Sequence, residues 1–71
     1  MSQQGQSQDD LPYRVELWGS ERLDVVERVL ARAVSVLLGQ ALFKAAQEEH
    51  PKRRITLSDA QRIIADSAPR A

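Results

Sequence analysis

The chain has 71 residues, no cysteine, and equal numbers of acidic and basic side chains, so its formal net charge is zero. This length allows one small domain, near the size at which a lone core is marginal and oligomerisation is a common remedy. The lack of cysteine excludes a disulfide framework and a thiolate metal site.

The two ends of the chain differ in composition from its middle. Residues 1–10 contain no apolar side chain after Met1, so they cannot bury enough surface to offset their ordering entropy and are predicted to form a disordered polar tail. Residues 68–71 are expected to fray. A single small domain is therefore expected over residues 11–67. No signal-peptide pattern is present, and the longest uncharged run, residues 33–43, is too short to span a bilayer. These features predict a soluble, cytoplasmic protein with no membrane contact.

The first predicted element is a strand over residues 13–18. Apolar and charged residues alternate there, which is typical of a half-buried strand. One face would hold Tyr13, Val15 and Leu17, and the other Arg14, Glu16 and Trp18. Residues 19–22 then read as a turn.

Residues 23–33 fit two descriptions. Read as a helix, they continue into the next element and produce one long helix over residues 22–49. Read as a strand, they place Val29, Ala31 and Ala33 on one face and Val26, Leu30 and Arg32 on the other. The density of valine favours the strand, because β-branched side chains lose rotamer freedom in a helix.

A helix is predicted from about Val36 to Glu49. Ser35 can cap its start, and Pro51 ends it by restricting His50. This helix has two apolar stripes. We expect the first to pack on the sheet and the second to face outward; the first comprises Val34, Leu38, Ala41, Leu42 and Ala45, and the second Val36, Gly39, Phe43 and Ala46. The predicted core is then Leu17, Leu38, Leu42, Ile55 and Leu57.

The last third of the chain predicts a β-hairpin. Two β-branched runs flank the polar residues 58–61, where Asp59 is a natural turn former. The whole chain therefore predicts an α+β fold, a four-stranded, mostly antiparallel sheet with one helix packed across it. The element order is ββαββ, with βαββ and one long helix as the alternative.

Four segments also resemble a group of small uncharacterised bacterial proteins with the ββαββ layout. The matching segments are residues 16–18, 27–33, 54–57 and 62–67. The resemblance covers about residues 12–67, implies the same fold, and brings no established activity. One departure is the hairpin turn, which has no glycine here.

Catalytic chemistry finds little support in the residues. His50 is the only histidine, and its position at a helix C-terminus suits a polar cap better than a general base. Glu48 and Glu49 point about 100° apart on a helix, so they do not form an acid/base pair. No serine-centred triad and no glycine-rich phosphate loop occurs. We therefore expect a non-enzymatic protein without a metal or another cofactor.

Two surfaces remain as candidate sites. Basic residues around a tryptophan, Trp18, could form a weak nucleic-acid-binding face on the sheet, with Glu16 and Asp66 lying among them; these basic residues are Arg14, Arg28, Arg32, Lys52, Arg53, Arg54 and Arg62. The favoured function is a protein–protein interaction or homodimerisation domain, because large apolar groups left exposed on a small domain usually mark a contact surface. The predicted interface is drawn from Trp18, Leu30 and Ile64 on the sheet and Val36 and Phe43 on the helix.

Overall fold

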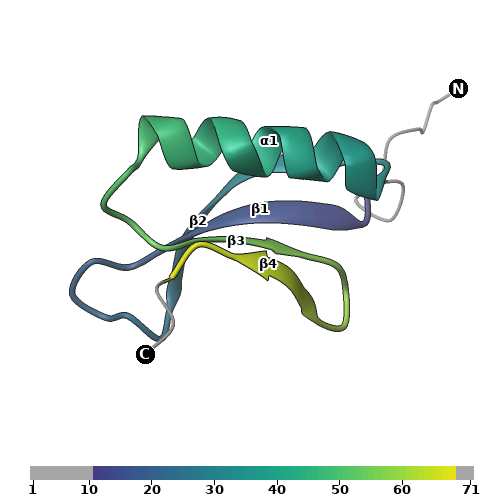
Figure 1. Cartoon of the computed structure of the whole chain (residues 1–71). Coiled ribbons are helices and arrows are strands. Elements are labelled where there is room, and N and C mark those ends of the chain that lie inside the picture. Colours follow the sequence, from purple (N-terminus) through teal and green to yellow (C-terminus); the bar gives the residue numbers. More distant parts are fainter. Residues whose placement is uncertain (1–10, 69–71) are drawn as a thin grey trace, which may run out of the picture.

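Four antiparallel strands form one open sheet, and a single helix covers one of its faces (Figure 1). The computed structural model describes residues 11–68. The elements are β1 (Tyr13–Trp18), β2 (Val26–Ala33), α1 (Val36–Glu49), β3 (Ile55–Ser58) and β4 (Ile63–Asp66). The predicted α+β fold and its ββαββ order are confirmed. The predictions for residues 1–10 and 69–71 lie outside the described residues.

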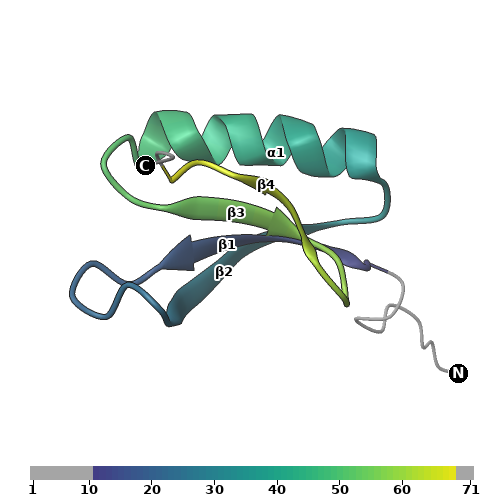
Figure 2. The ribbon, with the colours of Figure 1, turned by 60° about the horizontal axis from the view of Figure 1, so that its bottom comes forward.

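The strand order is β2-β1-β3-β4, so β1 and β3 are central and β2 and β4 are the edges. Every neighbouring pair is antiparallel. The helix contacts β1, β2 and β3 on one side of the sheet. Figure 2 shows the other side, which no element of residues 11–68 covers and which is called the open face below.

Residues 26–33 form a strand, so the alternative with one long helix is wrong. The valine-rich composition decided this, as expected for β-branched side chains on a pleated surface. The strand begins three residues later than the predicted segment, because residues 19–25 form a loop that is closed by two backbone hydrogen bonds. The Gly19 N–H donates to the Val25 carbonyl at 2.9 Å, and the Val25 N–H donates to the Arg22 carbonyl at 3.2 Å.

Two of the three β-bulges in the sheet change which large apolar side chains face the helix. The β1–β2 pairing shifts so that Leu30 has no direct partner, and the β3–β4 pairing shifts so that Ile64 has none. An extra residue in one strand breaks the strict alternation of faces. As a result Leu30 and Ile64 pack against the core, and their predicted place on the open face is wrong.

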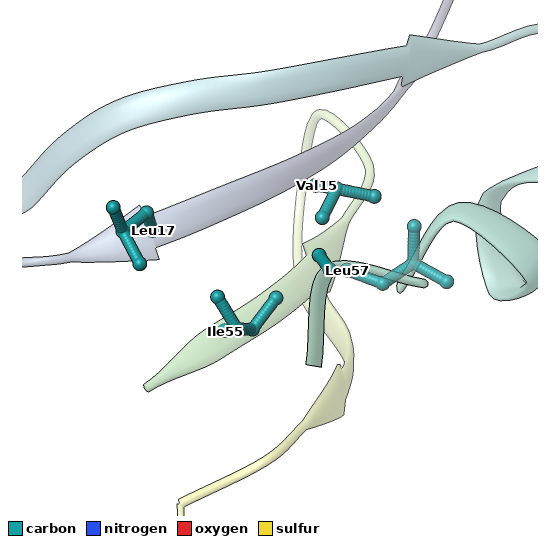
Figure 3. Packing of buried hydrophobic residues seen from close by; sticks show 5 residues of the cluster. Val15, Leu17, Ile55 and Leu57 are labelled. Atoms are coloured by element: carbon teal, nitrogen blue, oxygen red, sulfur yellow. The ribbon is translucent and has the colours of Figure 1, made fainter. Parts of the chain in front are cut away.

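The core lies between the central strands and α1. Figure 3 shows Val15 and Leu17 of β1 beside Ile55 and Leu57 of β3. These four side chains are buried, and Ala46 of α1 completes the buried cluster. The register pairs Val15 with Leu57 and Leu17 with Ile55, so the four share one face and interlock as cross-strand neighbours.

The helix has the predicted ends, but the opposite side of it from the predicted one packs on the sheet. Ser35 caps its start by accepting a bond from the Leu38 N–H at 3.2 Å, and His50 is its C-cap. Gly39 and Ala46 face the sheet, whereas the predicted core residues Leu38 and Leu42 are 52% and 36% exposed. No helix in the described part of the chain is long and apolar enough to cross a membrane.

The reason for this orientation is the close approach of α1 to the sheet at Gly39. A methyl group added at Gly39 would lie 2.9 Å from Cδ1 of Leu57, inside normal contact distance. The sheet-facing side of α1 is therefore the side with the smallest residues. The two leucines, which are larger, are left on the outside.

Replacing Leu57 by alanine is expected to lower the free energy of unfolding by about 2–5 kcal/mol, because it leaves a cavity under the helix. Replacing Leu38 by alanine removes the same volume from an exposed site. It should change the free energy of unfolding by about 0.5 kcal/mol or less. Urea unfolding at a concentration that keeps the chain monomeric measures both. Equal losses in the two variants would contradict the orientation of α1.

Replacing Gly39 by valine is expected to lower the free energy of unfolding by about 1–3 kcal/mol, because the added atoms overfill the contact with Leu57. Gln40→Val is the matched control, since it brings the same β-branched side chain into α1 at an exposed position. Thermal melts of both variants would show the difference. A Gly39→Val melt as high as that of Gln40→Val would mean that the helix can move off the sheet without loss.

Candidate functional site

The open face of the sheet carries a connected polar network. Strand alternation sends Arg14, Glu16 and Trp18 to this face, away from the core. The register sets Arg14 beside Ser58 and Glu16 beside Thr56 of β3. Glu16, Thr56 and Ser58 are buried even though no layer covers them. Neighbouring side chains on the curved sheet therefore shield these polar groups from water.

Glu16 is the centre of this network. Its Oε2 is 3.0 Å from Nε of Arg14, and its Oε1 accepts a bond from the Ser58 hydroxyl at 3.0 Å. The Thr56 hydroxyl also donates to Oε1 at 3.4 Å and accepts from the Trp18 indole N–H at 2.9 Å. A buried carboxylate is tolerated only when its oxygens are paired in this way. The network therefore orders the open face.

Arg54 covers the half-buried ring of Trp18 on the same face. Its guanidinium carbon lies 4.2 Å from the centre of the Trp18 ring, within cation–π range. Its Nε and one terminal nitrogen donate to the two carboxylate oxygens of Asp66 at 3.1 and 2.7 Å. These hydrogen bonds to Asp66 raise the pKa of Arg54. One side of the tryptophan ring is therefore occupied by a neutralised arginine, which leaves less of it for base stacking.

Arg53, in the α1–β3 loop, is bonded to β1 and β2 at one end of the sheet. One of its terminal nitrogens donates to the Trp18 carbonyl at 2.7 Å and to the Glu27 carboxylate at 2.6 Å. Its Nε is buried and has no hydrogen-bond partner among residues 11–68. Lys52, Arg53 and Arg54 line a hollow of about 460 Å³ beside Leu23 and Pro51. The geometry gives Arg53 a structural role in holding β1, β2 and the α1–β3 loop together.

The predicted basic patch is only partly assembled. Arg14, Arg32 and Arg54 lie on the open face, but Arg14 and Arg54 are paired with carboxylates. Arg28 is opposite Leu17 in the register, so its predicted place on the open face is wrong. The register shift at Leu30 explains this, because it exchanges the faces of the β2 residues between it and the next shift.

The remaining two members of the patch lie on loops. Lys52 is exposed in the α1–β3 connection. Arg62 belongs to the hairpin turn and lies 4.0 Å from the Asp59 carboxylate, with an exposed side chain. The basic residues are therefore spread over two loops and both sides of the sheet.

The predicted interface residues are placed differently from the expectation. Phe43 is half-buried and packs against the core together with Leu30 and Ile64. Trp18 is half-buried under Arg54, and Val36 is 39% exposed at the start of α1. The prediction that Phe43 faces outward is therefore wrong, for the same reason that Leu38 is exposed: the side of α1 that carries Gly39 faces the sheet.

Exposed apolar side chains gather on one side of α1, and this area is called the outer helix surface. Its most exposed member is Leu37, at 73%, which the sequence patterns did not single out. A signal was present, because Gly39 and Ala46 are small residues seven positions apart on one face and mark the side of closest packing. The outer helix surface consists of Val34, Leu37, Leu38, Ala41, Leu42 and Ala45.

The described residues offer few ligand groups for a metal. No three histidine, aspartate or glutamate side chains within residues 11–68 are close enough together to bind one ion. His50 caps α1 through its backbone N–H, which donates to the Ala46 carbonyl at 2.9 Å. A second hollow, of about 340 Å³, lies on the open face between Trp18 and the hairpin turn.

No protein-family model, no curated protein and no solved structure matches this chain.

The hairpin turn at the rim of the open face depends on Asp59, as predicted for a turn former. Its Oδ1 accepts bonds from the Gln61 and Arg62 N–H groups at 2.8 and 3.0 Å. These bonds lower the pKa of Asp59. The turn needs no glycine, because no residue among those described has a positive φ angle.

The lowered pKa of Asp59 predicts a pH dependence of stability. The native state binds this proton more weakly than the unfolded chain, so the carboxylate stabilises the fold above the unfolded pKa of about 3.9. This contribution is lost as the pH falls through the lower native pKa. Asp59→Asn keeps an acceptor but does not titrate. Urea midpoints from pH 6 to 2 should show the advantage of the native protein over Asp59→Asn shrinking with acidification. A constant difference would contradict the assignment.

Proposed function

We propose that this domain is a non-enzymatic protein-interaction module that associates with a second copy of itself through the outer helix surface. The observation that carries the proposal is the exposure of Leu37, Leu38 and Val34 on one side of α1, at 73%, 52% and 59%. Six apolar residues lie together there without a charged residue among them. Contiguous apolar areas of several hundred Å² on small proteins usually mark contact surfaces.

The size of the domain supports the same proposal. The main cluster contains five buried hydrophobic side chains, and only four of them are larger than alanine. A core this small supplies little net stability after chain entropy is subtracted. Burying the outer helix surface against a second copy would remove apolar area from water and stabilise the folded chain by mass action.

The alternative function, weak nucleic-acid binding on the open face, has less support. Arg14 and Arg54 are neutralised by Glu16 and Asp66, and Arg54 covers the tryptophan ring. Binding to phosphates would weaken steeply with salt, whereas apolar self-association would not. A salt series therefore separates the two proposals.

Sedimentation of the purified chain at high micromolar concentration is expected to show a dimer that persists at raised salt. Leu38→Lys should shift the protein toward monomer, because it sets a charge in the apolar contact. Gln40→Lys is the matched control, since it adds the same charge to an exposed position of the polar side of α1. Circular dichroism should be unchanged in both variants.

A monomer at all concentrations would contradict self-association. Equal dissociation by Leu38→Lys and Gln40→Lys would show that charge, and not the outer helix surface, controls the dimer.

A further inference from the structure

One edge of the sheet is formed by a long strand that pairs on one side only. β2 has eight residues and is bonded to β1 alone. The opposite edge strand, β4, has four residues. A long edge strand presents unpaired N–H and carbonyl groups, which makes it a template for pairing with another chain. β2 is therefore the stronger candidate for strand addition.

Part of the outer helix surface, with Leu38 and Leu42, points toward this same edge, whereas Leu37 points away from the sheet. The connection β2–α1–β3 is right-handed, as in nearly all such crossovers; in Figure 1, α1 runs from right to left above the sheet, with β4 nearest the viewer. Gly39 and Ala46 face the sheet. A rotation of 100° per residue then places Leu38 and Leu42 on the flank above β2, and Gln40 on the flank toward β4.

We propose that a second copy of the chain docks along this edge. The two β2 strands would pair antiparallel into one eight-stranded sheet, and the two α1 helices would pack antiparallel above the junction. This arrangement specifies the geometry of the self-association proposed above and rests on it. In this arrangement the edge of β2 and the flank of α1 above β2 belong to one interface.

A single two-fold axis satisfies both contacts. An axis perpendicular to the sheet makes both the strands and the helices antiparallel. α1 starts at the end of the sheet where β2 ends and runs back along it. The fourteen residues of α1 extend about 21 Å and the eight of β2 about 26 Å. Their midpoints therefore lie at similar heights, and an axis through the middle of β2 passes the middle of α1.

The helix flank is complementary to itself about this axis. If the axis passes between Ala41 and Leu42, Leu38 lies opposite Ala45 of the partner subunit, and Leu42 lies opposite Ala41 of the partner subunit. Each leucine then lies opposite an alanine, so large and small side chains alternate along the helix contact. No charged residue lies between Val36 and Phe43, so like charges do not meet at the centre.

The rest of the chain is a poor occupant for this surface. Residues 1–10 have no apolar side chain beyond Met1, so they offer nothing to cover Leu38 and Leu42. A second copy offers the matching leucines and alanines together with a matching strand edge.

The lack of native cysteine allows a direct test by disulfide trapping. Leu42→Cys sets a thiol next to the axis, where it would meet the same thiol of the partner subunit. Lys44→Cys is the control, since it sets an equally accessible thiol on the opposite flank. Mild oxidation should convert Leu42→Cys to a covalent dimer at least about tenfold faster than Lys44→Cys, because disulfides demand close, specific geometry.

Hydrogen exchange of the native chain tests the strand contact. Amides of β2 that are not bonded to β1 should become protected as the protein concentration rises, whereas outward amides of β4 should not. A sedimenting dimer without selective trapping of Leu42→Cys, or without added protection of β2, would overturn this arrangement and leave the proposed function standing. A monomer at high micromolar concentration would overturn both and leave a different protein as the occupant.

Discussion

The contact between Gly39 of α1 and Leu57 of β3 determines how the rest of the molecule is arranged. Leu57 is fully buried, and its side chain occupies the space that a β-carbon on Gly39 would need. The helix can therefore reach the sheet only with its smallest residues inward. This one constraint buries Ala46, draws Phe43 toward the core, and leaves the leucines of α1 in solvent. The outer helix surface is thus a consequence of how tightly the helix packs against the sheet.

The two faces of the sheet solve the problem of burial in different ways. On the helix side, aliphatic side chains of β1 and β3 interlock without polar atoms. On the open face, Glu16 is surrounded by hydroxyl and guanidinium donors, and Trp18 lies between Arg54 and Thr56. The second arrangement is dry at its centre without a covering layer. Two arginines of that face, Arg14 and Arg54, are paired there with carboxylates of the same domain.

Local patterns in the sequence predicted most of the fold. The alternation at residues 13–18, the valines of β2, the Ser35 cap and the Pro51 stop each have one simple physical meaning, and the strands and helix follow from them. The candidate site was harder to predict, because it depends on the rotation of α1 about its own axis and on the bulges at Leu30 and Ile64. With apolar residues on two sides of α1, periodicity alone did not decide between them. The small size of Gly39 and Ala46 carried that information.

The bulges at Leu30 and Ile64 also help to select a single strand register. A regular strand can slide by two residues and keep its pattern of faces, so weakly patterned sheets are prone to alternative pairings. Here each edge strand has one large aliphatic residue, Leu30 or Ile64, that packs against the core at a bulge. Sliding either strand would withdraw that side chain and leave an empty space under the sheet. These two bulges therefore fix both edge strands in one register.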